Sequence, residues 1–392
     1  MAPSGAAGAA ELPLGSRSLD ERRATVEVAS GVAWTRIVRE GGPWRVNVLT
    51  VARGARLLAV PGGDAVGDRA RPSVLSRELG AVAAVNGGYF ASDGNPVGVL
   101  AAAGRLVSEP VDGRSALVVG ADPMARTRVA AVRFAGSARV GGAPRLLDGV
   151  NRVPGQVPAC GGRGGDLPTE RPDAVTTCAD PSELVLFTPE WGARTPRSSL
   201  GAEAVIRGGA VTASRPGGGT PIPDDGVVLS GTGDAARLLR RAGVGAAVEV
   251  DLGLRSGRSA LAPEATAGIV GGGPRLLTRG RVRVRATAEG FAPPSAPGFF
   301  GSFVAARHPR TLVGVRADGT LLLVTLDGRR AGWSAGVTLV EAARVMRSLG
   351  AREALNLDGG GSSAMAVRGA IVSRPSDATG ERPVSDTLAV LP

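Results

Sequence analysis

Apolar and polar residues alternate along much of the first part of the chain. Over residues 25–59 the apolar positions include Trp34, Ile37, Val46 and Val48, with polar residues between them. A period of two is typical of strands that bury one face and expose the other. We therefore predict two or three half-buried strands in this segment.

Helix signals interrupt the strand pattern at two places. Pro72 begins a short predicted helix that ends before Gly80, and the apolar run 81–85 then leads as a strand into Asn86. Near the end of the chain, Thr338-Leu339-Val340-Glu341 forms a capping box, which opens a second predicted helix. Gly350 ends that helix, and its apolar positions lie on one face: Leu339, Ala343, Met346 and Leu349.

The remaining segments complete a predicted α+β fold. Asp318-Gly319 predicts a two-residue hairpin turn. We expect a helix over 235–242 and a surface loop over 286–302, which is rich in Gly, Pro and Phe. We therefore expect mixed, largely antiparallel sheets with flanking helices. The further strand candidates are 115–119, 127–134, 183–187, 202–211, 226–230, 246–251, 311–315, 321–326 and 354–357.

The domain organisation follows from where these patterns are regular. With 392 residues, the chain has room for two or three units or one large core. We expect a disordered leader at 1–20, a β-rich N-terminal segment at 21–70 and the main domain at 71–392. Periodicity is lost at about 141–180, and we interpret that stretch as an insertion.

Two stretches of the chain echo each other. Leu79-Gly80-Ala81 leads through an apolar run to Asn86-Gly87, and Leu349-Gly350-Ala351 leads in the same way to Asn356. Both read as helix, glycine, strand, asparagine and glycine-rich turn. The echo indicates either a duplication, which would bring both turns to one end of a sheet, or a common joint in a chain rich in Ala and Gly.

The composition favours short strands and limits the types of function that the chain can have. Hydrophobic residues make up 43% of the chain but aromatic residues only 3%, and 60 Gly and 28 Pro residues divide the apolar segments. The net charge is +11, and because the sequence contains no Lys, every side-chain ammonium is excluded. Arginine suits bidentate recognition of phosphate or carboxylate, although a coding bias towards Arg would produce the same composition.

The charge pattern argues against a nucleic-acid partner, and the apolar pattern against a membrane span. Basic residues are scattered among acidic ones, and few aromatic residues are available for stacking on bases. No run of about 18 apolar residues occurs. The first ten residues lack a basic start and an apolar stretch, so they do not form a signal peptide by themselves.

The two cysteines lie in the same irregular segment. Cys160 and Cys178 stand among Gly and Pro residues without metal-ligand spacing. We interpret them as a disulfide that fixes a loop, which favours an oxidising, extracytoplasmic location; two free thiols are the alternative.

The most distinctive group of candidate catalytic and binding residues follows Leu355. In Asn356-Leu357-Asp358, the amide and the carboxylate point to the same face of a strand end. The three following glycines allow a close approach of the backbone to a ligand, and their N–H groups can form a nest for an anion. Two hydroxyls then add hydrogen-bond donors. The string continues as Gly359, Gly360, Gly361, Ser362 and Ser363.

This string resembles the signature of the phosphodiester glycosidase family, which includes the lysosomal enzyme that removes N-acetylglucosamine from its phosphodiester to mannose. The resemblance covers roughly residues 71–391, which is most of the chain, and is strongest from Arg310 onward. Tyr89 departs from it, because Phe is common there, and the stretch 141–180 does not align. The other similar stretches are Asn86-Gly87-Gly88-Tyr89-Phe90, Thr188-Pro189-Glu190-Trp191-Gly192, Gly271-Gly272-Gly273-Pro274, Arg310-Thr311, Asp327-Gly328-Arg329 and Arg382-Pro383-Val384-Ser385-Asp386.

The resemblance implies hydrolysis of the bond between an anomeric carbon and phosphate, in a catalytic domain at 71–392. We expect Asp358 to act on the sugar as nucleophile or as base for water, with Asp327 as a second carboxylate and Asn356 beside them. We expect Arg310 to bind phosphate. Further candidates for substrate binding are Asn86, Gly87, the glycines and serines after Asp358, Arg382, Asp386, Glu109 and Arg114.

The expected substrate is a phosphorylated glycan, such as a cell-wall or exopolysaccharide polymer. Two alternatives stay open: an exo-glycosidase that acts on a neutral glycan, and a secreted polysaccharide-binding protein without activity.

Cofactor chemistry is limited by the residue inventory. His308 is the only histidine, so a His-rich metal centre is excluded, and we interpret His308 as a structural residue. The sequence requires no cofactor. It leaves open a hard cation such as Ca²⁺ or Mg²⁺, held by carboxylates near Asp93 or Asp327.

Overall fold

The computed structural model describes residues 21–111, 113–122, 126–154, 157–158, 167–168, 177–179, 181–198, 201–292 and 297–392. For 157–158, 167–168 and 177–179 the backbone alone is described. The expected leader at 1–20 and the expected disulfide between Cys160 and Cys178 fall outside the described residues and side chains.

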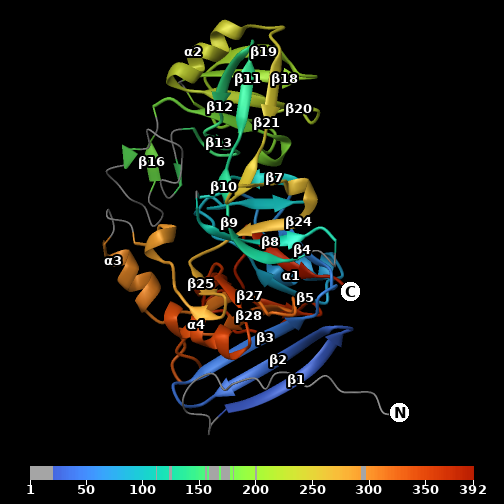
Figure 1. Cartoon of the computed structure of the whole chain (residues 1–392), viewed down its shortest axis with the longest axis vertical. Helices are drawn as coiled ribbons and strands as arrows, with labels where there is room; N and C mark the ends of the chain where they lie inside the picture. The colour runs from blue at the N-terminus through green and yellow to red at the C-terminus, as the bar shows by residue number, and fades with distance from the viewer. Residues whose placement is uncertain are drawn as a thin grey trace.

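A large antiparallel sheet forms the lower part of the molecule (Figure 1). Its order is β1-β2-β3-β28-β27-β29-β25-β26, so N-terminal strands pair directly with C-terminal ones. Its strands are β1 (Glu21–Ala29), β2 (Val32–Arg39), β3 (Trp44–Val51), β28 (Leu321–Leu326), β27 (Arg310–Val315), β29 (Glu353–Asn356), β25 (Arg275–Thr278) and β26 (Arg281–Val282).

Two five-stranded antiparallel sheets follow above it in Figure 1. The first has the order β31 (Ala370–Ile371), β30 (Met365–Val367), β5 (Ala83–Asn86), β32 (Asp386–Val390) and β4 (Leu57–Pro61). The second has the order β7 (Arg105–Ser108), β6 (Leu100–Ala102), β24 (Thr266–Gly271), β8 (Ser115–Gly120) and β9 (Arg128–Ala131).

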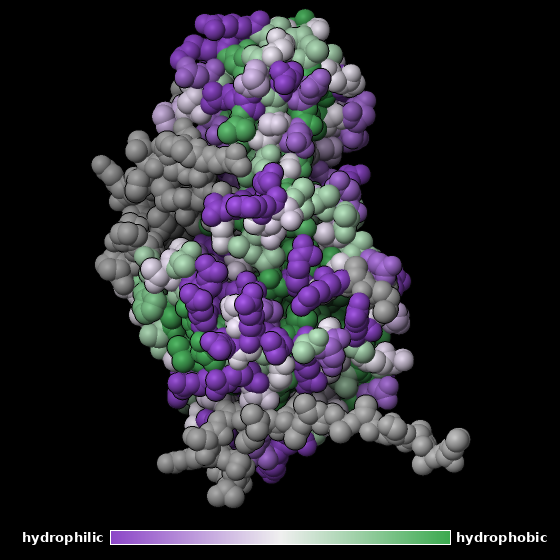
Figure 2. Space-filling view, viewed as in Figure 1, coloured by the Kyte–Doolittle hydropathy of each residue, from purple (hydrophilic) through white to green (hydrophobic). Residues whose placement is uncertain are grey.

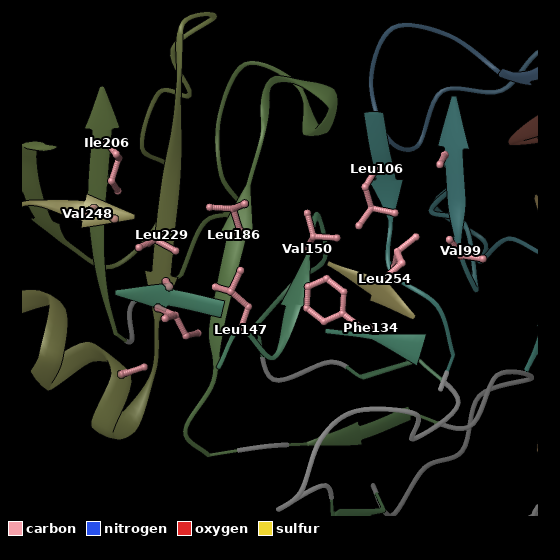
Figure 3. Close-up of a cluster of buried hydrophobic side chains, with 14 of the residues drawn as sticks. Val99, Leu106, Phe134, Leu147, Val150, Leu186, Ile206, Leu229, Val248 and Leu254 are labelled. Carbon is pink, nitrogen blue, oxygen red and sulfur yellow. The ribbon is translucent and has the colours of Figure 1, made fainter. Parts of the chain in front are cut away.

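The upper part holds one five-stranded and several three-stranded sheets, and it shares an apolar core with the sheet of β24 (Figures 1 and 3). One five-stranded sheet runs β13 (Gly149–Val150), β17 (Leu184–Phe187), β20 (Gly226–Gly231), β18 (Ala202–Arg207) and β19 (Ala210–Pro216). The three-stranded sheets are β12 (Ala143–Leu146), β11 (Ser137–Val140) and β21 (Val248–Asp251); β10 (Arg133–Phe134), β22 (Leu254–Ser256) and β23 (Ser259–Leu261); and β14 (Val157–Pro158), β16 (Thr177–Ala179) and β15 (Leu167–Pro168).

The described helices are short and few. The α-helices are α1 (Pro72–Glu78), α2 (Gly233–Ala242), α3 (Pro297–Phe300) and α4 (Leu339–Ser348). The tighter or wider turns are η1 (Pro189–Trp191), η2 (Pro263–Ala265), η3 (Thr287–Glu289), η5 (Gly360–Ser362) and the π-turn η4 (Gly301–Ala305).

Three apolar layers stabilise this arrangement. One face of the large sheet packs on α4 through residues such as Val324 and Met346, while the other face packs on the two sheets above it through Leu323 and Val85. The third layer joins the upper sheets to the sheet of β24, and Figure 3 shows that it extends from Ile206 and Leu186 through Phe134 to Leu106. On the face drawn in Figure 2, hydrophilic side chains cover much of the lower half.

The predicted elements largely hold, with local differences. The capping box at Thr338 and Glu341 is present. The hairpin between β27 and β28 turns through 317–319 rather than two residues, because Arg316 N–H donates to Thr320 O at 2.9 Å and Gly319 takes φ +90°. The expected loop at 286–302 contains η3, α3 and the start of η4.

The sequence echo has a structural counterpart. After α1, Gly80 at φ +60° turns the chain and Ala81 N–H donates to Ser76 O at 2.8 Å. After α4, Gly350 takes φ +85° and Ala351 N–H donates to Met346 O at 3.0 Å. A positive φ at the residue after a helix strongly favours glycine. Each helix is thus followed by a strand, β5 or β29, that ends at a glycine-rich turn.

Candidate functional site

The two glycine-rich turns meet between the large sheet and the sheet of β5. Asn86 Nδ2 donates to Asp358 O at 2.8 Å, and Asp358 N–H donates to Gly87 O at 3.0 Å. Asn86 Oδ1 accepts from Thr311 Oγ1 at 2.6 Å and from Ala364 N–H at 3.1 Å. The fully buried Asn86 amide therefore joins the turns rather than facing a ligand.

Asp358 is the partly buried carboxylate of this junction. Burial raises its pKa to about 6, although the Ser362 hydroxyl, the Gly359 N–H and the charge of Arg382 favour its ionised form. The negative charge of Asp386 raises the pKa further. A carboxyl group of this kind can change its protonation state near neutral pH, as a catalytic acid or base must.

Asp386 lies on the other side of Gly87, at the start of β32. Its Oδ1 accepts from Gly88 N–H at 2.9 Å and its Oδ2 accepts from Ser385 Oγ at 2.9 Å. Burial outweighs these bonds and raises its pKa to about 6 as well. The Asn86-Gly87-Gly88 turn thus lies between two carboxylates whose pKa values are raised by burial.

The glycine turn after Asp358 directs most of its amides inward. Gly359 N–H donates to Asp358 Oδ1 at 2.8 Å, and Gly360 N–H donates to Pro309 O at 2.9 Å. Ser362 and Ser363 N–H groups donate within the turn at 3.2 Å each. These four amides have protein acceptors, so they do not form the nest for an anion that the sequence predicts.

Asn356 supports the site from below. It is fully buried, and its Nδ2 donates to Tyr89 Oη at 2.6 Å and to Gly273 O at 3.1 Å. Tyr89 Oη itself donates to Gly273 O at 2.5 Å. Burial and the charge of Asp358 raise the pKa of Tyr89, so its phenol stays protonated. Asn356 therefore orients Tyr89 rather than standing beside Asp358 at a surface.

Arg310 is a buried guanidinium close to Tyr89. Its side chain is 1% exposed and donates only to main-chain carbonyls, Val337 O at 3.3 Å and Phe303 O at 2.5 Å being the main ones. It also lies over the Phe303 ring, at 5.1 Å from the centroid. Burial lowers its pKa to about 10. Within the described residues no carboxylate forms an ion pair with it.

Arg114 is a second guanidinium of the same kind, also close enough to Tyr89 to affect its pKa. It is 8% exposed, donates to Glu289 O at 3.2 Å and lies over the Phe291 ring at 4.4 Å. Burial lowers its pKa. Among the side chains that the structure describes, none provides Arg114 with a carboxylate at ion-pair distance. The two arginines therefore bring two weakly hydrated positive charges to the surroundings of one phenol.

Arg382 and the two serines border the glycine turn. Arg382 Nη1 donates to Ser362 Oγ at 3.3 Å, and its guanidinium pairs with Asp377 at 2.7 Å. This ion pair fills the space beside Gly361, since a Cβ there would lie 2.3 Å from Arg382 Nη2. Ser363 Oγ is buried and has no partner in the described part of the chain. Arg382 thus connects to Asp358 through Ser362.

Asp327 and Glu109 are placed apart from this junction. Both carboxylate oxygens of Asp327 are used, Oδ2 by Trp333 Nε1 at 2.9 Å and Oδ1 by Arg374 N–H at 3.0 Å. Glu109 belongs to a buried ion network in which Arg152 contacts it at 2.7 Å and also pairs with Glu183. Burial raises the pKa of Glu109 to about 7 and that of Asp327 in the same direction.

Tyr89 and Arg329 are two residues of the site for which the sequence alone predicts no role. Arg329 donates to His308 Nδ1 at 3.2 Å, and a Cβ on Gly360 would lie 3.1 Å from its Nη1. Arg329 therefore covers the glycine turn. Its place in the Asp327-Gly328-Arg329 stretch, which resembles the family, could have indicated such a role. For Tyr89, the signal was its place directly after Asn86-Gly87-Gly88.

Within the described residues, no group of three or more His, Cys, Asp or Glu side chains could hold a metal ion. In the same residues, no helix has the length and apolar character needed to cross a membrane.

Comparison with known families identifies the class of domain. Residues 200–391 match the family model of the phosphodiester glycosidases. Over these residues, just under half of its length, the chain is similar to the phosphodiester glycosidases, as the signature after Leu355 predicts. The match includes Asp358, Arg310 and Asp386, whereas Asn86, Tyr89 and Arg114 lie before it.

Particular relatives agree with this assignment. The chain is 39% identical over 80 residues to the mouse N-acetylglucosamine-1-phosphodiester alpha-N-acetylglucosaminidase, and this stretch is 20% of the chain and 15% of the mouse protein. It is 44% identical over 84 residues, 21% of the chain, to the SPbeta prophage-derived uncharacterized protein YomE of Bacillus subtilis, of which 13% is covered. The chain thus matches only a small part of each curated relative.

A solved structure extends the likeness over the full chain. The crystal structure of a candidate exported protein from Burkholderia pseudomallei K96243 is 28% identical, covers 100% of both chains and has a TM-score of 0.87. The largely antiparallel architecture of this chain is therefore shared from end to end with that protein.

Proposed function

We propose that this chain hydrolyses glycosyl phosphodiesters at the junction of Asp358, Asp386 and Tyr89. One observation carries the proposal: two buried carboxylates of raised pKa lie at a junction where two buried arginines, Arg310 and Arg114, approach the same tyrosine. Acid–base catalysis requires carboxylates that titrate near neutral pH, such as Asp358 and Asp386. Binding of a phosphate requires positively charged donors, which the two arginines provide. The family match points to the same reaction.

Arg310 and Arg114 form the proposed phosphate site. A guanidinium removed from water loses hydration that main-chain carbonyls replace only in part. A phosphodiester anion between the two arginines would restore that loss through charge-assisted hydrogen bonds. Because Phe303 and Phe291 stack under the guanidiniums, both groups are held in place before the substrate arrives.

Asp358 is the proposed group on the sugar side. With a pKa of about 6 it is mostly ionised at neutral pH. The phosphate leaves as a stable anion that keeps the electron pair of the broken C–O bond, so it needs little help from a proton. Asp358 then either attacks the anomeric carbon itself, followed by water, or takes a proton from a water that attacks. Retained or inverted configuration of the product distinguishes these routes.

Asp386 is proposed as a positioning residue for this chemistry. Its carboxylate accepts from the Gly88 amide, and its charge adds to the effect of burial, which raises the pKa of Asp358. We further propose that the natural substrate is a phosphorylated cell-wall polymer or exopolysaccharide and that the protein works outside the cytoplasm. The likeness to a candidate exported protein supports this location.

The direct test is a screen of the purified protein against α- and β-linked glycosyl methyl phosphodiesters. Product configuration is followed by NMR, and matched neutral methyl glycosides serve as the comparison. We expect turnover of a phosphodiester, a loss of at least about 100-fold in kcat/KM for Asp358→Asn and for Arg310→Ala, and no turnover of the neutral glycosides.

Controls separate loss of function from loss of fold. Arg344 and Arg347 are exposed on α4, so Arg347→Ala should leave kcat/KM unchanged. Arg310→Lys keeps the charge but not the two-pronged geometry and should recover only part of the activity. Turnover of neutral glycosides alone, or glycan binding without any turnover, would overturn the proposal.

A further inference from the structure

Three arginines gather around one tryptophan in the loop that follows β28. The guanidinium carbons of Arg374, Arg45 and Arg36 lie 5.0, 5.1 and 5.7 Å from the centroid of the Trp333 ring. They come from β2, β3 and the segment after β31, so the fold, and not a basic run in the sequence, assembles them. We call these four residues the Trp333 cluster.

The cluster has unused hydrogen-bonding capacity. Arg45 donates to Glu40 Oε2 at 3.1 Å. Arg36 and Arg374 are exposed, and within the described residues their guanidinium groups form no ion pair and donate no hydrogen bond. Asp327, at the edge of the ring, already accepts from Trp333 Nε1 and from the Arg374 main chain, and the charges of Arg36 and Arg374 favour its ionised form. Two guanidiniums are therefore held by the indole with free donors.

The carboxylates of Asp327 and Glu40 offset part of the charge of the three guanidiniums, and cation–π attraction alone does not offset the rest. At exposed sites it contributes about 0.5–1 kcal/mol per pair, while like charges brought together repel one another. An anion with several oxygens would remove the repulsion and fill the donors, and planar guanidiniums suit phosphate in particular. The cluster has the chemistry of a phosphate subsite.

The cluster lies close to the candidate catalytic turn. Trp333 and Arg329 belong to one loop, which is closed by Ser334 N–H donating to Arg330 O at 3.0 Å. Arg329 covers Gly360, beside Asp358. Four residues of chain reach at most about 14 Å. Arg330 Nη2 also donates to Pro375 O at 2.9 Å, which fixes the segment that carries Arg374.

We propose that the Trp333 cluster binds a second phosphate of the same substrate, so that the substrate class is an oligomer or polymer with phosphodiesters at more than one position. The proposal rests on the proposed function, which places the first phosphate at Arg310 and Arg114. A substrate with a single phosphodiester would leave the cluster empty, and a polymer with phosphate in its repeat would reach both sites.

Binding is tested with inorganic tripolyphosphate as the probe, by calorimetry and by tryptophan fluorescence. We expect a fluorescence change that Trp333→Phe abolishes, and an affinity about tenfold weaker in Arg36→Ala/Arg374→Ala. The control Arg344→Ala/Arg347→Ala removes the same charge from the exposed face of α4 and should change affinity less than about twofold. Equal weakening in both double variants would show a general charge effect and overturn the proposal.

Steady-state kinetics test the proposed role of the Trp333 cluster independently. In Arg36→Ala/Arg374→Ala, kcat/KM should fall about tenfold for a glycosyl phosphodiester oligomer with two phosphates and stay within about twofold for one with a single phosphate. Equal effects on both substrates would count against the cluster while leaving the proposed function intact. If no phosphodiester is turned over by the wild-type protein, the proposed function fails and the tripolyphosphate measurement alone decides the cluster.

Discussion

The carboxylate of Asp386 fills the space that a side chain on Gly87 would need. A Cβ at position 87 would lie 1.8 Å from Asp386 Oδ1, well inside van der Waals contact. The backbone of Gly87 does not have a positive φ, so glycine is required there by packing and not by conformation. The two residues therefore constrain each other at the centre of the candidate site.

Gly87→Ala should consequently damage both fold and activity. Overpacking of this kind costs about 1–3 kcal/mol of unfolding free energy, and a displacement of about 1 Å in a catalytic group costs about 100-fold in rate. Urea unfolding and kcat/KM measure the two effects. Gly301→Ala, where a Cβ meets nothing within 4 Å, is the control. If the clash is the cause, Gly87→Ala/Asp386→Ala should be more stable than Gly87→Ala alone.

Removing the charge of Asp386 should shift the pH dependence of activity. Its negative charge raises the pKa of Asp358, so Asp386→Asn should lower that pKa from about 6. The acidic limb of kcat/KM, which follows ionisation of Asp358, should then move to lower pH. Asp318→Asn, at the far end of the β27–β28 hairpin, should leave the limb in place. An unchanged limb in Asp386→Asn would show that the two carboxylates are not coupled.

Stability should depend on pH through the same pair. The folded-state pKa of Asp386, about 6, lies above its ordinary value of 3.8. Its stabilising contribution is therefore complete below about pH 4 and is lost as pH rises through 6. Relative to wild type, Asp386→Asn should gain about 3 kcal/mol in unfolding free energy at pH 8 and almost nothing at pH 4. Urea unfolding at the two pH values checks the sign, and a gain of equal size at both would contradict it.

The ion network of Glu109, Arg152 and Glu183 should matter for stability rather than for substrate. Arg152→Ala would leave two buried carboxylates without their partner and should cost about 3–5 kcal/mol of unfolding free energy. Glu109→Gln should keep kcat/KM within about twofold. Thermal unfolding and steady-state kinetics separate these effects. A large loss of kcat/KM in a folded Glu109→Gln protein would instead support the sequence-based expectation that Glu109 binds substrate.

Local patterns predicted much of the fold. The capping box at Thr338, the glycine after each helix and the alternation before β4 each act within a few residues, so their signals are visible in the sequence. The start of a helix in the stretch 286–302 was missed because its Gly and Pro residues are typical of loops. The pairing of β3 with β28 could not be predicted either, because nothing in the sequence of one strand indicates which strand lies beside it.

The candidate site was predictable in position but not in detail. Asp358 and Asn86 stand in distinctive strings, and the structure brings them together. Which face each side chain takes was not predictable: Asn356 points inward to Tyr89, and Asp327 is tied to Trp333. Glu109 is next to Arg152 only in three dimensions. Such differences arise from contacts between segments far apart in the chain, which composition and spacing do not record.

The topology of the large sheet determines when its central strands can pair during synthesis. Val51 at the end of β3 pairs with Leu321 at the start of β28, so the edge of β3 stays bare while the ribosome adds most of the chain. Contacts of such high sequence separation slow folding and leave an open strand edge that invites aggregation. A nascent chain of this topology therefore has a long interval in which chaperones can hold it unfolded.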